Sequence, residues 1–320
     1  MKPSTTNPIP LIVMAGSDPT PAALPEEGAQ LHPIQGPKGM SLKIGGRPLI
    51  DLLLEPLVSS GCFDPIFIAG PTTEYGPSRQ GCEVIDTNSG FGANIRAALQ
   101  VVAPRARDGI VALTTCDILP TADELRELME DYFARVPIDF WFPLIIAPNE
   151  PDQLGASFWK PRYQVLDQPG GKPVSFLPGH LIVVDTLAAR VPLVVRAFDL
   201  AYRTRNRGIL YRMVVMISGV LAGLLWQDLK HLASFRLPTM TFSVTYNGIM
   251  LALELRKGES TSDELAERLE KSFIRYRHRR KYPERVGRLP LMKALSLAKD
   301  FDTQEEAAEI ATQSEIGSPG

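Results

Sequence analysis

The sequence predicts a three-layer α/β/α protein, in which a mostly parallel sheet lies between helices, with an additional, mainly helical C-terminal lobe. Two observations predict this class. Strand and helix patterns alternate over residues 10–185, and several strands are short apolar runs typical of strands buried on both faces. The composition then changes, and mainly helical patterns follow over residues 186–294. We therefore expect an α/β domain over residues 1–185 and a separate lobe after it.

The first domain contains six strand candidates and three helix candidates. The strands are expected at residues 11–15, 65–69, 82–85, 110–114, 140–146 and 181–184. The helices are expected at residues 49–60, 93–102 and 122–134. Thr121 is placed to cap the last of these helices, with Glu124 at the capping-box position. Residues 147–178 are rich in Pro and Gly, which predicts loops with a short hairpin.

The rest of the chain is expected to contain helices, one strand pair and a tail. In order, these are a helical pattern at 186–237, strands at 240–244 and 249–255, a helix at 262–277 and a disordered tail at 311–320. Ser260 or Ser262 is the expected cap of the 262–277 helix.

Two stretches of the lobe have an unusual composition. Residues 213–226 are the most apolar part of the chain but are shorter than the roughly 20 residues that a membrane span needs. We interpret them as a buried helix, or as a helix that docks on a membrane surface or on a dimer partner. The basic run at 275–281 forms a solvated face, or contacts a phosphorylated substrate or an anionic lipid headgroup.

Composition and charge narrow the functional class. A chain of 320 residues with 44% hydrophobic and 22% charged residues is typical of a soluble globular protein. The net charge of −2 gives no general attraction to nucleic acid, and no nucleic-acid motif accompanies the basic run. The cysteines Cys62, Cys82 and Cys116 are too few and too scattered for a disulfide framework or a zinc site. We therefore predict a reducing, cytoplasmic setting and no nucleic-acid partner.

The N-terminal segment has an order that suggests phosphate binding. An apolar strand ends at Gly16, a loop leads to Lys38, and the turn at residues 43–50 leads into a helix. Gly16 lets the backbone approach a ligand closely, and Pro48 presets the first turn of the helix. Lys38, which lies between the loop after Gly16 and the turn at residues 43–50, is suited to contact phosphate oxygens.

This order resembles the N-terminus of the sugar-phosphate and molybdopterin-guanylyl (MobA-like) nucleotidyltransferases. The chain keeps the Ala15-Gly16 and Pro37-Lys38 pairs and the Gly-Arg-Pro-Leu-Ile run at 46–50, whereas residues 17–21 replace the family's second glycine and arginine. The resemblance implies a Rossmann-like sheet of the GT-A type. It also implies that Ala15, Gly16, Ser17 and Lys38 hold a nucleoside triphosphate, with Lys43 as the alternative lysine.

Asp117 is the first candidate metal ligand. It lies just past the end of the buried strand at 110–114, and ligands of open α/β sheets bind at that edge. A carboxylate there can hold Mg²⁺ against phosphate oxygens, or it can cap the next turn. The nucleotidyltransferase family carries an aspartate at this point, so the resemblance implies that Asp117 binds Mg²⁺ and is catalytic.

A second candidate metal ligand, Asp302, comes near the end of the chain. Asp300, Asp302 and Thr303 precede a glutamate-rich run, which by itself is a good helix-cap sequence. The segment resembles the family's late Asp-x-Asp-Thr element, which returns a carboxylate to the metal. The resemblance therefore implies that Asp302 shares Mg²⁺ with Asp117 and that residues 295–310 complete the first domain.

A further element, from Asp86 to Arg96, leads from a strand into a helix. Gly90 and Gly92 allow close approach of the backbone, and a helix N-terminus favours anions. The resemblance implies base and sugar contacts near here, with Asn94 as a polar contact. A plain loop with a helix cap is the alternative.

The predicted function is a Mg²⁺-dependent nucleotidyltransferase. It would transfer a nucleoside monophosphate from an NTP to a sugar phosphate, alcohol phosphate or cofactor phosphate and release pyrophosphate. The lobe would select the acceptor, with Arg279 and Arg280 as candidate contacts. A GT-A glycosyltransferase that uses a nucleotide-sugar and a non-catalytic nucleotide-binding relative are the alternatives.

Overall fold

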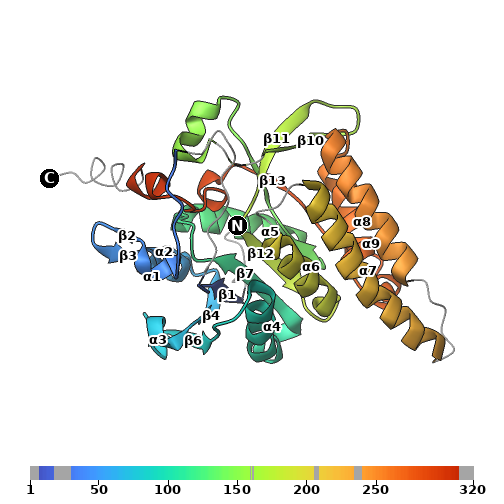
Figure 1. The fold of residues 1–320 in the computed structure, drawn as a ribbon, viewed down its shortest axis with the longest axis horizontal. Coiled ribbons are helices and arrows are strands. Elements are labelled where there is room, and N and C mark those ends of the chain that lie inside the picture. The colour runs from blue at the N-terminus through green and yellow to red at the C-terminus, as the bar shows by residue number, and fades with distance from the viewer. Residues whose placement is uncertain are drawn as a thin grey trace.

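The computed structural model describes residues 7–17, 30–158, 160, 162–204, 209–233 and 240–309, and it contains a seven-stranded, mostly parallel sheet (Figure 1). The strand order across this sheet is β5 (Ser78–Arg79), β6 (Cys82–Asp86), β4 (Phe63–Gly70), β1 (Ile9–Met14), β7 (Ile110–Thr115), β12 (Leu181–Asp185) and β8 (Phe140–Trp141). The four central strands β6, β4, β1 and β7 are parallel, whereas β5, β12 and β8 pair antiparallel to their neighbours. The predicted α/β class is confirmed.

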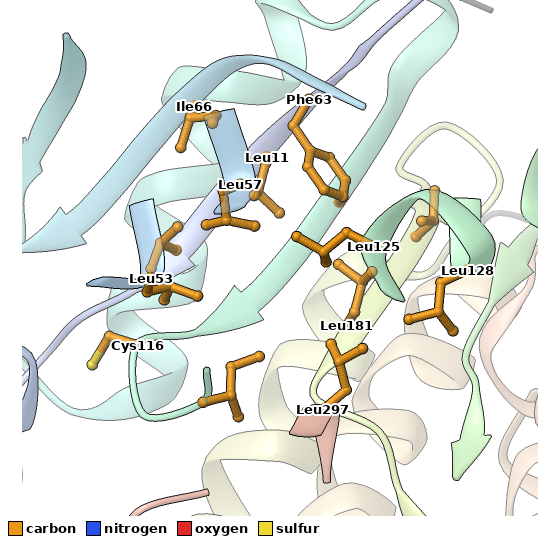
Figure 2. Packing of buried hydrophobic residues seen from close by; sticks show 14 of the residues in the cluster. Leu11, Leu53, Leu57, Phe63, Ile66, Cys116, Leu125, Leu128, Leu181 and Leu297 are labelled. Atoms are coloured by element: carbon orange, nitrogen blue, oxygen red, sulfur yellow. The ribbon is translucent and has the colours of Figure 1, made fainter. Parts of the chain in front are cut away.

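Alternate side chains of β1 pack on opposite faces of the sheet, because successive residues of a strand point to opposite sides. On one face Leu11 belongs to the core that covers α2 (Leu49–Ser60) and α5 (Ala122–Arg135), shown in Figure 2. On the other face Ile12 belongs to a core shared with α4 (Phe91–Val102). Burial on both faces explains why the strand is a continuous apolar run, and the expected three layers are present.

The predicted capping box of α5 is present. The Thr121 hydroxyl oxygen accepts the Glu124 N–H (N···O 3.2 Å), and the Thr121 N–H donates to the Glu124 carboxylate (N···O 2.8 Å). Two N–H groups that the helix cannot pair internally are thereby satisfied.

We expect Thr121→Ala to lower the free energy of unfolding by about 1 kcal/mol, because the first turn of α5 loses its acceptor. Urea unfolding measures this. Thr121→Ser keeps the hydroxyl and serves as the control. An equal loss in both variants would show that the hydrogen bond is not the cause.

A second, four-stranded sheet has the order β10 (Tyr163–Leu166), β11 (Pro173–Pro178), β9 (Leu144–Ile146) and β13 (Leu291–Met292). The expected hairpin within 147–178 is β10–β11. The single strand predicted at 140–146 is wrong, because the chain leaves the first sheet after β8 and enters the second at β9. Pro143 lies at the break and has no N–H with which to continue a ladder.

The lobe is built mainly from helices. They are α6 (Val191–Arg203), α7 (Ile209–Ala233), α8 (Met240–Lys257), α9 (Ser262–Phe273) and α10 (Tyr276–Lys281). In Figure 1 the long helices lie side by side at the right of the molecule. Within the part of the chain that the structure describes, no helix is long and apolar enough to cross a membrane.

The strand pair predicted at 240–244 and 249–255 is wrong, because these residues form α8. The Asp228 carboxylate accepts the N–H groups of Met240 and Thr241 (N···O 3.1 and 2.7 Å) and so starts the helix. Val244 then packs on α7 and Leu251 on a core that includes residues of α9, which supplies the burial that a helix of low intrinsic propensity needs.

Other predicted boundaries in the lobe also shift. The 186–237 pattern is divided between α6 and α7, and the 262–277 helix ends at Phe273. Its cap is Thr261, whose hydroxyl oxygen accepts the Glu264 N–H, and not Ser260 or Ser262. The predicted tail at 311–320 lies outside the described residues.

Short elements complete the fold: α1 (Lys38–Ser41), β2 (Lys43–Ile44), β3 (Arg47–Pro48), α3 (Thr72–Tyr75), η2 (Ala103–Arg105), η3 (Arg107–Gly109), η4 (Pro151–Ser157) and η5 (Leu295–Leu297). η5 returns the chain to the first sheet. Leu297 is fully buried near Leu181 (Figure 2), and its carbonyl accepts the His180 N–H (N···O 2.8 Å). This return carries the last described residues toward the end of β7.

Candidate functional site

Lys38, Asp117 and Asp302 meet at one point beside the sheet. Lys38 Nζ lies 3.0 Å from Asp117 Oδ2 and 2.5 Å from Asp302 Oδ1. The three side chains retain only 12%, 16% and 17% of their exposure. Residues that lie 79 and 264 positions apart in the chain therefore form one cluster.

Strand geometry places Asp117. β7 runs parallel to β1, and the Cys116 N–H still donates to the Met14 carbonyl (N···O 3.0 Å). Asp117 is the next residue, so its carboxylate lies at the carboxyl edge of the sheet, where α/β proteins bind ligands. Ala15, Gly16 and Ser17 follow β1 at the same edge.

Backbone contacts and a helix cap place Asp302. The Phe301 N–H donates to the Asp117 carbonyl, and the Ile34 N–H donates to the Asp302 carbonyl (both N···O 2.8 Å). The Glu306 carboxylate accepts the Asp302 N–H (2.7 Å) and the Thr303 N–H (3.0 Å), and the Thr303 hydroxyl oxygen accepts the Glu306 N–H (3.3 Å). The Asp-Thr sequence is thus a helix cap that also fixes a carboxylate in the cluster.

The Lys38 ammonium is held in its charged form. Burial alone would lower its pKa, but the carboxylates of Asp117, Asp302 and Asp300 outweigh burial and raise the pKa above its ordinary value. Burial alone would raise the pKa of Asp117, but the positive charge of Lys38 outweighs burial there and the pKa is lowered. The group can therefore deliver a fixed positive charge at the sheet edge.

The small residues under Lys38 have a packing role. A Cβ on Gly39 would lie 2.7 Å from the Tyr75 hydroxyl oxygen and 3.5 Å from Cys116 Sγ, so α1 can approach the sheet only with glycine there. Burial raises the pKa of Cys116 to about 12, which keeps the thiol protonated. Cys116 is thus a small buried thiol and no nucleophile.

The sequence analysis missed a second lysine at this site and gave Asp300 no role of its own. Lys160 Nζ forms ion pairs with Asp300 Oδ1 and with Glu306 Oε1, the latter at 3.2 Å. Lys160 follows η4, in a loop without periodic pattern, so the sequence carries no signal for this contact. His180 Nδ1 lies 3.0 Å from Thr115 Oγ1, and His180 Nε2 lies 3.8 Å from Asp300 Oδ1.

These residues fit a divalent cation. Carboxylate oxygens of Asp117, Asp300 and Asp302 lie within 4.8 Å of one another. Asp117 Oδ1 is buried without a hydrogen-bond partner. With Glu306, four carboxylates face the two ammonium groups of Lys38 and Lys160, which leaves an excess of negative charge. Clustered hard oxygen ligands with surplus charge are what Mg²⁺ prefers.

Asp302 can take up a proton and so balance part of this excess. Burial, followed by repulsion from Asp300, raises the pKa of Asp302 to about 7, although Lys38 opposes the shift. Lys160 and His180 instead lower the pKa of Asp300 against its burial. The protonated and ionised forms of Asp302 are therefore both accessible near neutral pH.

We expect Mg²⁺ to bind about tenfold more tightly at pH of about 8 than at about 6, because a carboxyl of pKa about 7 is roughly 10% ionised at the lower pH and roughly 90% at the higher. Calorimetric titration of the protein with MgCl₂ measures this. Asp302→Asn should weaken binding and remove the pH dependence. A pH dependence that persists in that variant would assign it to another group.

One pair of predicted nucleotide contacts is brought together. A Cβ on Gly16 would lie 2.8 Å from Asn94 Nδ2, so the end of β1 and the first turns of α4 are in contact. Asn94 is 97% buried, and its Oδ1 accepts the Ser89 N–H (N···O 3.0 Å). Asn94 therefore fixes the 87–90 loop beside Gly16.

Gly90 and Gly92 have a different environment. Asp199 of α6 lies over the N-terminus of α4, where its Oδ1 accepts the Gly92 N–H (N···O 3.3 Å). A Cβ on Gly92 would lie 2.5 Å from the Asp199 Cβ, and Gly90 lies near the same carboxylate. The close packing of α6 on α4 therefore requires a residue without a side chain at position 92. The Asp199 carboxylate occupies the helix N-terminus at which we expected a ligand anion.

The structure does not bring three other predicted residues to the cluster. Lys43 is exposed on the β2–β3 hairpin. Arg279 and Arg280 lie on α10, and the Arg275 N–H that precedes α10 donates to Ala188, just after β12. Because β12 is antiparallel to β7, this is the edge where β7 begins, a strand's length from Asp117. This placement does not support the acceptor contact expected for Arg279 and Arg280, which stays a prediction.

A second acidic cluster lies at that opposite edge. Asp139, Asp185 and His278 offer ligand atoms within 4.8 Å. Arg285 already lies between the carboxylates, with its Nη2 2.6 Å from Asp185 Oδ2 and its Nε 3.1 Å from Asp139 Oδ1. A buried guanidinium in the centre makes this an ion-pair network that joins β12, β8 and α10, and not a metal site.

Comparison with one solved structure supports the fold. A hypothetical transferase from Thermus thermophilus matches with a TM-score of 0.52 at 20% identity, over 94% of this chain and 100% of the other. A CMP:2-keto-3-deoxy-manno-octonic acid synthetase in complex with CTP (TM-score 0.48, 10% identity, 96% and 98%) and 4-diphosphocytidyl-2C-methyl-D-erythritol synthase from Anaerococcus prevotii (0.45, 7%, 97% and 99%) are also similar. No protein-family model and no curated protein matches the sequence.

Proposed function

We propose that this protein is a Mg²⁺-dependent nucleotidyltransferase that joins a nucleoside monophosphate from an NTP to a phosphorylated small-molecule acceptor and releases pyrophosphate. The observation that carries the proposal is the convergence of Lys38, Asp117 and Asp302 at the carboxyl edge of the sheet. The sequence resemblance to MobA-like and sugar-phosphate nucleotidyltransferases names the same three residues independently.

Asp117 and Asp302, with Asp300 beside them, would hold Mg²⁺. When bound, the ion neutralises charge on the phosphate oxygens. Lys38 would exchange its contacts with the two carboxylates for contacts with the triphosphate, where its fixed charge favours the transition state. The backbone of Ala15, Gly16 and Ser17 would border the phosphates. Chemistry of this kind depends on positioning and electrostatics and needs no covalent nucleophile.

The placement of Lys38 favours this reaction over the glycosyltransferase alternative. A glycosyltransferase would use a nucleotide-sugar, which carries one or two phosphates where an NTP carries three. A lysine between the two metal-binding carboxylates is suited to the larger charge of a triphosphate. Retention of the whole cluster also argues against a non-catalytic relative. The free cysteines and the NTP substrate favour the reducing cytoplasm.

The test is a screen of the four NTPs with Mg²⁺ against sugar 1-phosphates, alcohol phosphates and cofactor phosphates, with pyrophosphate release as the readout. We expect one NTP and one acceptor class to give release that EDTA abolishes. Release of a nucleoside diphosphate from a nucleotide-sugar, with no pyrophosphate from any NTP, would instead establish the glycosyltransferase. Tight NTP binding without turnover of any acceptor would establish a binding protein.

A further inference from the structure

The helices α7 and α8 expose apolar side chains along one stripe each. On α8 the stripe consists of Phe242, Tyr246, Ile249 and Leu253, whose spacing of four, three and four residues places them on one side of a helix. Phe242 is 77% exposed, which is unusual for so large an apolar residue.

The stripe on α7 includes Val214, Leu225, Trp226, Leu229 and Leu232, and Trp226 is 61% exposed. α7 and α8 contact each other through Leu224 and Val244, so the two stripes lie on neighbouring helices. We call these nine exposed residues the hairpin face. Rows of large exposed apolar side chains on two neighbouring helices are typical of a docking site for a protein or a membrane.

The charged residues near the hairpin face indicate whether a protein or a membrane is the better partner. The exposed charged side chains that the structure describes on the two helices are Lys230, Arg256 and Lys257, and all are basic. Of the two acidic residues, Asp228 is buried and caps α8, and Glu254 is ion-paired with Arg268 (N···O 3.0 Å). Lys230 and the Arg256–Lys257 pair lie toward opposite ends of the hairpin, because α8 runs back along α7.

We propose that the hairpin face binds the surface of a membrane that contains anionic phospholipids. Apolar and aromatic side chains would enter the boundary between headgroups and acyl chains, and the basic residues at the ends would contact lipid phosphates. Trp and Tyr side chains favour that boundary because they combine an apolar ring with a polar group.

A second copy of the chain fits the face less well. A symmetric dimer places the same surface on both sides of the contact. Basic residues would then have no exposed acidic residue of α7 or α8 to pair with, and like charges at an interface oppose association. An anionic bilayer offers acyl chains to the apolar residues of the face and negative headgroups to the basic residues.

Vesicle flotation with the full-length protein tests the proposal. We expect the protein to float with vesicles of phosphatidylcholine and phosphatidylglycerol, and much less with phosphatidylcholine alone or at high salt. Phe242→Glu should reduce the bound fraction about tenfold, since it places a charge in the apolar layer. Val58→Glu is the matched control, because Val58 is 53% exposed on α2, outside the face, and should bind as the wild type does.

Trp226 provides a second readout that does not depend on the Glu variants. Brominated phosphatidylcholine in the anionic vesicles should quench the tryptophan fluorescence of the wild type, and Trp226→Phe should remove that quenching. Absence of flotation with both vesicle types would overturn the proposal. So would flotation that Phe242→Glu leaves unchanged, or a dimer in light scattering that Phe242→Glu dissociates while vesicles bind nothing, which would assign the face to a second copy.

Discussion

Replacing Asp117 with Asn is expected to reduce Mg²⁺-dependent pyrophosphate release by at least about 100-fold, because a metal ligand that stabilises the transition state contributes several kcal/mol and each 1.4 kcal/mol is about tenfold. An amide oxygen carries no formal charge and binds Mg²⁺ more weakly than a carboxylate. The fold should persist, because Asp117 Oδ1 has no hydrogen-bond partner, the Asn amide oxygen can still accept the hydrogen bond that Lys38 donates to Oδ2, and Asp302 still balances the charge of Lys38. Initial rates at saturating NTP and Mg²⁺ measure the effect, and circular dichroism checks the fold.

Two variants sharpen this test. Asp123→Asn removes a charge six residues further on, from a side chain that is 93% exposed, and should leave the rate unchanged. Asp302→Asn should be as damaging as Asp117→Asn at alkaline pH. Its deficit should shrink as the pH falls below about 7, because wild-type Asp302 is then also uncharged. Wild-type activity in either site variant would remove that residue from the metal site.

The core of this site could be predicted because each of its parts has a local signal. A buried apolar run followed by an aspartate indicates a central parallel strand. The carboxyl ends of parallel strands share one edge of the sheet, so Asp117 is expected at that edge. The cap at Thr303 fixes Asp302, and that cap is also visible as a short sequence pattern. The same holds for α5, whose capping box sets its first residue.

The parts that could not be predicted depend on contacts between distant segments. Lys160 lies in an irregular loop, and only its packing against Asp300 and Glu306 shows that it belongs to the site. The β-branched and aromatic residues of α8 favour a strand locally, but the Asp228 cap and burial against α7 and α9 decide for a helix. The acceptor contact of Arg279 and Arg280 was predicted from their charge alone. The antiparallel direction of β12 instead puts them at the edge of the sheet where β7 begins.

Replacing Lys38 with Ala is expected to lower the rate and, at the same time, to tighten the binding of Mg²⁺ alone. Loss of a preorganised charge-stabilising group costs roughly 2–4 kcal/mol of transition-state stabilisation, which is roughly a 30- to 1000-fold slower reaction. The ammonium lies between Asp117 and Asp302, so without ligand it competes with the metal for the same oxygens. Removing it leaves carboxylates without their counter-ion, and a divalent cation then restores the balance.

The two effects have opposite signs, which separates the proposed role from simple damage to the site. Calorimetry with MgCl₂ should show a lower Kd for Lys38→Ala than for the wild type, and added Mg²⁺ should raise the Tm of the variant by more than that of the wild type. Lys43→Ala, which removes an exposed lysine from the β2–β3 hairpin, should change neither the rate nor the Kd. A Lys38→Ala variant that loses Mg²⁺ binding together with activity would show that Lys38 organises the carboxylates and does not exchange with the metal.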